Sequence, residues 1–398
     1  MTKPALLVLN AGSSSLKFGL YAAADLALLC RGGIDAAPGG PRLELEGPRA
    51  EALRRQSGAP GDGSQAGMLA WLFGALRGLG SNTPLAAAGH RVVHGGARHA
   101  APARVSAELL AELAGYSALA PQHQPHNLAG IRAVAAAWPA LPQVACFDTA
   151  FHRTQPRLAQ LFGLPRALSE AGVLRYGFHG LSFEYIAGRL ADFGLDADAR
   201  VIVAHLGHGA SLCAMQHGRS VATTMGFSTL DGLLMGQRCG ALDPGVVLHL
   251  LRSGEFDLGS VERLLNEQSG MLGVSGLSDD ARVLEASSDP HAREALELFA
   301  YRVARELGSH VAALGGLDAL VFTAGIGEHS AAMRARIAAL SGWCGIALDA
   351  DANARHAARI SAPGARVSVH VVPTDEEIVI ARAARSVALA AGPAGLQP

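Results

Sequence analysis

A strand–turn–strand pattern occurs twice in this chain, once in each half, and it constrains the fold more than any other feature. In the first copy an apolar run at residues 5–9 meets a turn of small residues and resumes at residues 16–20. In the second copy the apolar run at residues 201–206 meets a similar turn and resumes at residues 210–215. Short apolar runs bounded by such turns are typical of buried strands. We therefore expect two related sheets.

The length of the chain and its later elements extend this expectation. At 398 residues the chain exceeds the size at which one hydrophobic core keeps growing, so we expect two domains with a boundary near residue 150. Apolar residues at three- and four-residue spacing predict a helix over residues 296–314. A buried strand at residues 319–323 is expected to end in a glycine turn. Thr374 and Glu377 have the spacing of a capping box, which predicts a helix beginning at Thr374.

Composition excludes several classes of protein. Hydrophobic residues make up 49% of the chain and charged residues 17%, as in a globular protein with a sizeable core. The formal net charge of −1 gives no general attraction to nucleic acid or to an anionic membrane. No run approaches the length of a membrane span. The five cysteines are scattered and form no Cys-x-x-Cys motif, which favours a reducing compartment. We expect a soluble, cytoplasmic protein.

The first turn, residues 10–17, has the sequence Asn-Ala-Gly-Ser-Ser-Ser-Leu-Lys. Backbone N–H groups, three hydroxyls and one lysine can converge there on a phosphate. The Gly-x-x-x-x-Gly-Lys-Ser/Thr pattern of a P-loop is absent from the sequence. The alternative is an ordinary hairpin turn, in which serine is also common. Both interpretations stay open on the turn alone.

Nine motifs favour the phosphate-binding interpretation, because together, and in the same order along the chain, they resemble those of the acetate kinase family. They occupy residues 10–17, 90–96, 146–152, 176–180, 205–211, 235–244, 275–282, 322–328 and 374–377. That family belongs to the superfamily of acetate and sugar kinases, Hsp70 and actin. The resemblance implies an α/β fold of duplicated ribonuclease H-like domains, with mixed sheets flanked by helices and the active site in the cleft between the domains.

The resemblance also implies a reaction and its participants. The family transfers the γ-phosphoryl group of ATP to acetate, reversibly and by direct in-line transfer, giving acetyl phosphate and ADP. Mg²⁺ is the expected cofactor, with Mn²⁺ as the alternative, and a homodimer is the expected assembly. Residues 1–150, with a C-terminal helix at about residues 383–398, would bind phosphate and substrate. Residues 151–382 would bind the nucleotide.

Roles for individual residues follow from the same resemblance. The catalytic set is Asp148, His179 and Arg238, and the acid-binding set is Arg91, Val93, Gln122, Phe178 and Thr229. The metal ligands are Asn10 and Glu376. The nucleotide set is Ser13, Ser15, Lys17, His205, Leu206, Gly207, His208, Gly209, Asp280, Ala281, Arg282, Gly325, Ile326, Gly327, Glu328 and His329. An arginine on a transferring phosphoryl group contributes roughly 10³–10⁵ in rate, so Arg238 is expected to be the least replaceable.

Four positions depart from the family's usual pattern. His208 and His329 each stand where the family usually has Asn, and the imidazole of His208 can gain a charge that would strengthen phosphate binding as the pH falls. Gln122 replaces an apolar residue of the acyl pocket, and Thr229 replaces a proline. Because one methylene is worth only about 1–3 kcal/mol of discrimination, both acetate and propionate are candidate substrates.

Two other functions are weighed against acetate kinase. A propionate or other short-chain acyl kinase would use the same chemistry on a longer acid. A non-catalytic nucleotide switch of the actin and Hsp70 type would need neither Arg91 nor the pair His179 and Arg238. This chain has all three residues, which favours the kinase.

Overall fold

The computed structural model describes residues 4–37, 40–55, 62–79 and 83–388 and forms two compact units. Unit 1 consists of Met1–Ala150 and Asp375–Pro398, and unit 2 of Phe151–Thr374. The sequence had placed residues up to 382 in the second domain. Residues 375–382 instead belong to unit 1, because helix α16 (Glu376–Ala383) packs against strands of that unit. Of the expected C-terminal segment, residues 389–398 lie outside the described part of the chain.

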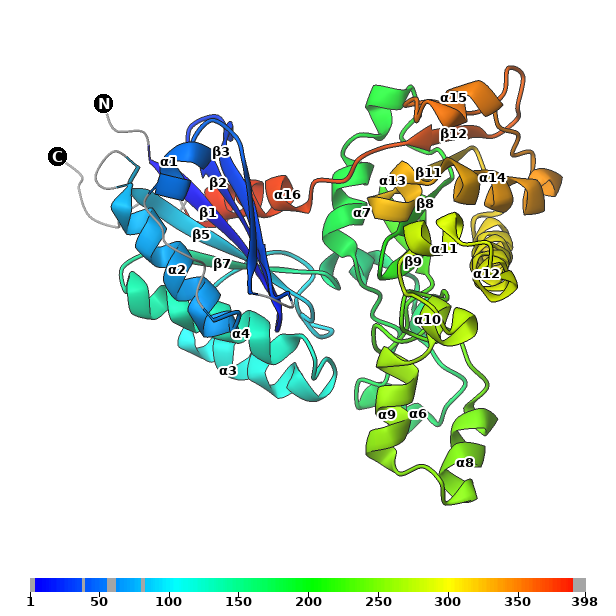
Figure 1. Ribbon diagram of the computed structural model, residues 1–398, viewed down its shortest axis with the longest axis horizontal. Helices are drawn as coiled ribbons and strands as arrows, with labels where there is room; N and C mark the ends of the chain where they lie inside the picture. Colours follow the sequence, from blue (N-terminus) through cyan, green and yellow to red (C-terminus); the bar gives the residue numbers. More distant parts are fainter. Residues whose placement is uncertain (1–3, 38–39, 56–61, 80–82, 389–398) are drawn as a thin grey trace. The chain divides into compact units, whose positions relative to one another are not determined.

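Unit 1 is built on one mixed seven-stranded sheet of order β4-β3-β2-β1-β5-β7-β6 (Figure 1). Strands β1 to β4 form antiparallel neighbours, β1, β5 and β7 run parallel, and β6 is antiparallel to β7. The strands are β1 (Ala5–Ala11), β2 (Ser15–Ala22), β3 (Leu28–Asp35), β4 (Arg42–Glu46), β5 (Leu85–Val92), β6 (Ala103–Arg104) and β7 (Gln143–Phe147).

Helices cover both faces of this sheet. Leu7 and Ala88 lie in one core cluster with residues of α2 and α4. Side chains alternate across a strand, so Gly89 faces the other side, where a β-carbon on it would lie 2.5 Å from Ile380 of α16. The helices of this unit besides α16 are α1 (Ala50–Arg55), α2 (Gln65–Gly78), α3 (Ala107–Gly115), η2 (Tyr116–Ala118), α4 (Gln124–Ala137) and the π-helical turn η6 (Ala384–Ala388).

Unit 2 repeats the same strand order around a five-stranded sheet, β10-β9-β8-β11-β12. Strands β8, β9 and β10 are antiparallel neighbours, and β8, β11 and β12 run parallel, as do β1, β5 and β7 in unit 1. The strands are β8 (Val201–Leu206), β9 (Ala210–Gln216), β10 (Arg219–Thr223), β11 (Ala319–Thr323) and β12 (Ser368–Val371). The predicted duplicated α/β fold with mixed sheets is confirmed.

The longest helix of unit 2 is α12 (Pro290–Leu314), and it buries the predicted apolar stripe, including Phe299, Val303 and Leu307. The predicted glycine turn after β11 is instead a short helix, α13 (Ala324–His329), which continues through Ser330 into α14 (Ala331–Leu340). The others are η3 (Ala150–Thr154), α5 (Arg157–Gln160), α6 (Arg166–Glu170), α7 (Gly180–Ala187), η4 (Leu190–Phe193), α8 (Pro244–Ser253), α9 (Leu258–Glu267), α10 (Gly270–Ser275), α11 (Ala281–Ala286), η5 (Gly342–Cys344) and α15 (Ala350–Ala354).

The start of α16 differs from the sequence prediction. The N-cap is Asp375, whose carboxylate accepts a hydrogen bond from the backbone N–H of Ile378. The Thr374 hydroxyl is instead 2.9 Å from the Ser182 hydroxyl, so it makes no capping box with Glu377. No helix in the described part of the chain combines the length and apolar composition needed to cross a membrane.

Candidate functional site

In unit 1 the candidate residues gather where parallel strands end. Asn10 lies near the end of β1, Arg91 near the end of β5, and Asp148 directly after β7. Because these three strands run parallel, their carboxyl ends share one edge of the sheet. The sheet therefore brings together residues that are more than a hundred positions apart in sequence.

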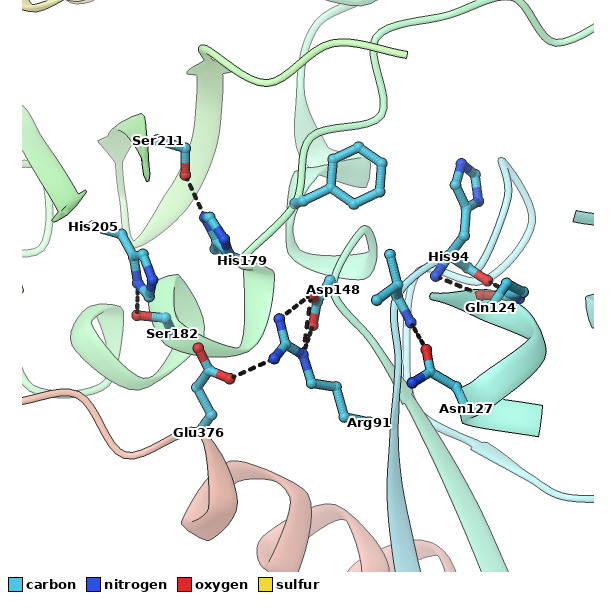
Figure 2. A network of polar contacts seen from close by, with 12 residues as sticks. Arg91, His94, Gln124, Asn127, Asp148, His179, Ser182, His205, Ser211 and Glu376 are labelled. Atoms are coloured by element: carbon cyan, nitrogen blue, oxygen red, sulfur yellow. Dashed lines mark hydrogen bonds and ion pairs between the residues drawn. The ribbon is translucent and has the colours of Figure 1, made fainter. Parts of the chain in front are cut away.

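Arg91, Asp148 and Glu376 form a charged cluster at this edge (Figure 2). Arg91 Nε lies 2.9 Å from Asp148 Oδ1, and Arg91 Nη2 lies 2.6 Å from Asp148 Oδ2. Arg91 Nη1 lies 3.6 Å from Glu376 Oε2. Burial raises the pKa of the Asp148 carboxyl, while the Arg91 guanidinium acts in the opposite direction. Burial also disfavours the charge on Arg91, but the two carboxylates outweigh it and raise its pKa.

The turn between β1 and β2 is open to solvent. Ser13 is exposed, Ser15 is half-buried, and the backbone N–H of Gly12 donates to the Ser15 carbonyl at 2.8 Å. Asn10 pairs with Lys17 across the two strands, which places an amide and an ammonium group side by side in register. The exposed hydroxyl and ammonium groups of this turn are accessible to an anionic ligand.

Two hydrogen-bonding residues at the β5 end were missed by the sequence analysis. Asn127 of α4 accepts from the Val93 N–H at 3.0 Å and donates to the Ala11 carbonyl at 2.9 Å. Gln124 accepts from the His94 N–H at 3.1 Å and donates back to the His94 carbonyl at 3.0 Å. Both amides are buried, so the segment after β5 is held in place (Figure 2). A cluster of amide side chains at a helix start was the available signal.

The residues expected to bind the acid differ in their exposure. Val93 and Phe178 are buried, as expected of apolar contacts. Gln122 is exposed in the turn before α4. Thr229 uses its backbone carbonyl to accept a hydrogen bond from Arg238 Nη1 at 2.6 Å.

In unit 2, His179 is held on three sides. It is the N-cap of α7 in a left-handed backbone conformation, with φ of 58°. Its Nδ1 lies 2.8 Å from Ser211 Oγ, and its ring stacks on His205 with centroids 4.2 Å apart. Ser211 reaches this position because it is the register partner of His205 in the β8–β9 hairpin. Left-handed non-glycine residues are strained and concentrate at functional sites.

Arg238 is half-buried, and its guanidinium has no carboxylate partner within the described residues. Burial lowers its pKa to about 10, so the side chain stays charged at neutral pH. A β-carbon at Gly209 would lie 2.6 Å from Arg238 Nη2 and 3.2 Å from His179 Nε2. The bare backbone of Gly209 therefore lets these two side chains approach the β8–β9 turn together. A guanidinium without a carboxylate partner is well suited to an anionic ligand.

The candidate nucleotide segments converge around the ends of β8 and β11. His205 and Thr323 are register partners, so the 205–209 turn and α13 lie side by side. His208 Nε2 lies 3.1 Å from Asp279 Oδ2, which joins the turn to the segment before α11. The structure thus brings the candidate nucleotide residues of unit 2 together from three stretches of sequence.

Several of these side chains already have partners. Glu328 accepts from the backbone N–H groups of Ala324 at 2.8 Å and Thr374 at 3.2 Å. Arg282 is exposed and pairs with Asp280 at 2.6 Å. His329 is exposed, and its Nε2 lies 3.9 Å from Glu328. Only backbone and exposed faces of these residues are open to a ligand.

The residues of unit 1 fit a magnesium ion chemically. Asn10 and Glu376 offer an amide and a carboxylate oxygen, and both lie on elements that pack together, β1 and α16. Mg²⁺ prefers such oxygen ligands and keeps several waters, so one or two protein ligands are enough. The described residues contain no group of three or more His, Cys, Asp or Glu side chains placed for a metal.

Comparison with known proteins gives one consistent result. A model of the acetokinase family matches residues 5–382. An acetate kinase from Rhodopseudomonas palustris is 55% identical over 386 residues, which are 95% of this chain and 96% of that protein. An acetate kinase from Nitrobacter hamburgensis is 47% identical over 388 residues, or 95% of this chain and 94% of that protein.

Solved structures agree with the sequence relatives. A propionate kinase from Francisella tularensis has a TM-score of 0.87 at 34% identity, covering 96% of this chain and 100% of that one. An acetate kinase from Porphyromonas gingivalis has a TM-score of 0.82 at 32% identity, covering 96% and 99%. These neighbours share the fold over essentially the whole chain.

Proposed function

The chain belongs to the acetokinase family, as its motifs predicted, and we propose that it is a Mg²⁺-dependent acetate kinase. An acetate oxygen forms a bond to the γ-phosphorus of ATP, and the bond from that phosphorus to the β–γ bridging oxygen breaks. The products are acetyl phosphate and ADP, and the same atoms transfer in reverse. The observation that carries the proposal is the half-buried Arg238, which has no carboxylate partner among the described residues and approaches the Gly209 turn together with His179 Nε2.

Arg238 and His179 stabilise the transferring phosphoryl group. Its transition state spreads negative charge over the equatorial oxygens, and catalysis depends on positioning and on charge neutralisation. Arg238 supplies a full positive charge that no protein carboxylate in the described chain neutralises. His179 Nδ1 lies 2.8 Å from Ser211 Oγ, and in the tautomer that carries its proton on Nε2 the ring donates a hydrogen bond to a phosphoryl oxygen.

Arg91 binds the carboxylate of the acid, and Asp148 orients Arg91. The bidentate contact with Asp148 fixes the plane of the guanidinium, so the remaining N–H groups have a defined direction. Asn10 and Glu376 are the proposed ligands of Mg²⁺, with Mn²⁺ as the alternative. When bound, the metal neutralises phosphate charge.

The nucleotide is bound by backbone and exposed polar groups. The proposed set comprises Ser13, Ser15 and Lys17 on the first turn, residues 205–209, Asp280, Ala281 and Arg282, and residues 325–329. The support is their placement at open turns and at the ends of β8 and β11. Ala281 is buried, so its contribution would be shape more than polar contact.

The acid substrate is acetate, with propionate as the alternative. Val93 and Phe178 are the buried apolar residues of the proposed acyl pocket, while the exposed Gln122 adds little to its walls. Trapping of acyl phosphate with hydroxylamine, using acetate, propionate or butyrate with ATP and Mg²⁺, tests the assignment. We expect the largest kcat/KM with acetate. A larger kcat/KM with propionate would reassign the substrate.

The enzyme is proposed to be a homodimer in the cytoplasm. Every residue of α8 is exposed or half-buried in the single chain, although the helix is rich in apolar side chains. Leu242, Val246, Leu248 and Leu251 are between 37% and 49% exposed. Several exposed apolar side chains on one helix are typical of a protein interface, and a second copy of the chain is the proposed occupant. The five cysteines are free thiols, in keeping with a reducing compartment.

A further inference from the structure

His152 is a buried, titratable residue to which the proposed mechanism gives no role. It lies in the short helix η3 within unit 2, at the end of the motif that spans residues 146–152. Its side chain is completely buried. A histidine in such a position either only packs in the hydrophobic core or fixes the conformation of a neighbouring segment through its hydrogen bonds.

The hydrogen bonds of His152 define which ring nitrogen carries the proton. Its Nε2 lies 2.9 Å from the Phe178 carbonyl oxygen, which can only accept. Nε2 is therefore the protonated nitrogen, and Nδ1 accepts from the Ser220 hydroxyl at 2.9 Å. Burial lowers the pKa of His152 to about 4, so the ring is neutral at physiological pH and has this single tautomer.

The carbonyl that His152 binds belongs to the peptide between Phe178 and His179. On either side of Phe178 the backbone is left-handed, with φ of 75° at Gly177 and 58° at His179. A left-handed non-glycine residue costs about 1–2 kcal/mol and persists only when its surroundings fix it. A hydrogen bond to the 178–179 peptide restricts the rotation of that peptide plane, and so restricts the direction of the His179 side chain.

The packing around this peptide leaves little freedom. A β-carbon at Gly177 would lie 2.6 Å from both His152 Cδ2 and Thr223 Cγ2. The His152 ring is in edge-on contact with Phe183 of α7, at 5.5 Å between centroids. The imidazole thus contacts the chain just before His179 and the helix that His179 caps.

We propose that His152 is a positioning residue that directs His179 Nε2 toward the transferring phosphoryl group by donating to the Phe178 carbonyl. The inference rests on the proposed role of His179 in phosphoryl transfer. It assigns to His152 an effect on kcat that a core filler would not have. Misplacement of a catalytic group by about 1 Å can lower the rate by roughly 10²-fold.

Two isosteric variants separate the hydrogen bond from the packing. In His152→Gln the amide nitrogen can take the place of Nε2 and donate to the Phe178 carbonyl. In His152→Asn the shorter amide takes the place of Nδ1 and leaves that carbonyl without its donor. We expect kcat of the asparagine variant to be roughly 10- to 100-fold below that of the glutamine variant. The KM for ATP should differ between them by less than about threefold, because neither variant replaces a residue of the proposed nucleotide set.

A double-mutant cycle with His179→Ala provides the second readout. If His152 acts through His179, then His152→Asn should lower kcat by less than about threefold in the His179→Ala background. Equal kcat values for the two His152 variants, or an undiminished asparagine effect in that background, would overturn the inference. If the asparagine variant does not fold, the glutamine variant alone provides the test. A glutamine variant that has the Tm of the wild type but no kinase activity would also overturn the inference. A wild-type protein that forms no acyl phosphate would instead refute the proposed function.

Discussion

Arg91 binds Asp148 through two of its nitrogens and directs the third toward Glu376. Nε and Nη2 contact the two oxygens of Asp148 at 2.9 and 2.6 Å, while Nη1 lies 3.6 Å from Glu376. Asp148 is 2% exposed and the Arg91 side chain 20%, so one end of the pair is accessible to a ligand and the other is not. This geometry makes Asp148 the fixed support of Arg91 and leaves Nη1 as the nitrogen most available to a substrate carboxylate.

Replacement of Asp148 by Asn should affect both stability and substrate binding. The change leaves Arg91 with Glu376 as its carboxylate neighbour in unit 1 and removes one member of a buried ion pair. Breaking such pairs costs about 3–5 kcal/mol, and the partial exposure of Arg91 places our expectation at about 2–3 kcal/mol. The measurements are thermal unfolding and the KM for acetate, which should rise. Asp318→Asn is the matched control, because Asp318 pairs with Arg200 near the surface and should cost less than about 1 kcal/mol. Equal losses in the two variants would contradict the account.

Gly209→Ala should reduce catalysis more than stability. Its new methyl group would come within 2.6 Å of Arg238 Nη2 and 3.2 Å of His179 Nε2. One or both side chains must move, and we expect kcat to fall by roughly 10²-fold. Gly163→Ala serves as the control in the same unit, since its methyl group would meet no atom within 4 Å and its backbone is not left-handed. The measurements are kcat from steady-state kinetics and Tm from thermal unfolding, for both variants. Wild-type kcat in Gly209→Ala would show that the two side chains do not need their present positions.

Arg31 should influence the requirement for Mg²⁺ without touching the metal. Arg31 Nε donates to Glu377 at 3.0 Å, and Nη2 donates to Asp375 at 2.7 Å. These residues flank the proposed ligand Glu376, so Arg31 fixes the first turn of α16 to β3. Lysine cannot make both contacts. For Arg31→Lys we expect the Mg²⁺ concentration at half-maximal rate to rise roughly 10-fold.

The control for Arg31→Lys is Arg200→Lys. Arg200 likewise uses two nitrogens in carboxylate contacts, here both with Asp318 at 2.9 and 2.6 Å, but it lies just before β8 in unit 2. Initial rates across a Mg²⁺ titration should leave the Arg200 variant near wild type. An equal shift in both variants would refute a specific link between Arg31 and the metal.

The exposed apolar helix α8 predicts the effect of a charge on assembly. In Leu248→Glu a carboxylate replaces a side chain that is 49% exposed in the single chain. Light scattering after size-exclusion chromatography should give twice the chain mass for the wild type and a shift toward monomer for this variant. Leu158→Glu, at a residue that is 85% exposed on α5, should leave the mass unchanged. A monomeric wild type would contradict the proposed dimer.

The protein should lose stability as the pH falls below about 6.5, the ordinary pKa of histidine. Burial lowers the pKa of His310 from 6.5 to about 4. Between pH 6.5 and pH 4 the unfolded chain binds a proton at His310 that the folded chain does not bind. The contribution of neutral His310 to the free energy of unfolding is therefore complete above pH 6.5 and is lost as the pH approaches 4. Each such group contributes up to about 1.4 kcal/mol per pH unit. Burial also lowers the pKa of His90 and the pKa of His152 to about 4.

His310→Asn isolates one of these contributions. The amide can still donate to the Glu306 carbonyl, which now accepts from His310 Nδ1 at 2.8 Å, but it does not titrate. The variant should lose less Tm than the wild type between pH 7 and pH 5, by about 2–4 °C for each kcal/mol. Parallel Tm curves for the two proteins would show that His310 is not the buried neutral group described here.

Local patterns in the sequence were sufficient to predict the duplicated sheets and the buried stripe of α12. They did not identify the N-cap of α16, because Thr374 and Asp375 are both good caps and only the contact of Thr374 with Ser182 excludes the first. The positions of Asn127 and His152 also depend on partners far away in the chain, which no local pattern contains. The expectation for Gln122 came from the family resemblance, and its exposed position in the turn before α4 leaves that role a prediction.

The central claim is that Arg238 neutralises the phosphoryl group in transit to the acid. The most direct test is hydroxylamine trapping of acyl phosphate by wild type, Arg238→Lys and Arg238→Ala, with ATP, Mg²⁺ and saturating acetate. We expect robust product from the wild type, a kcat lower by roughly 10³-fold or more in Arg238→Ala, and an intermediate value in Arg238→Lys. Tm and ATP binding should stay close to wild type. An Arg238→Ala variant that retains more than about a tenth of wild-type kcat would contradict the account.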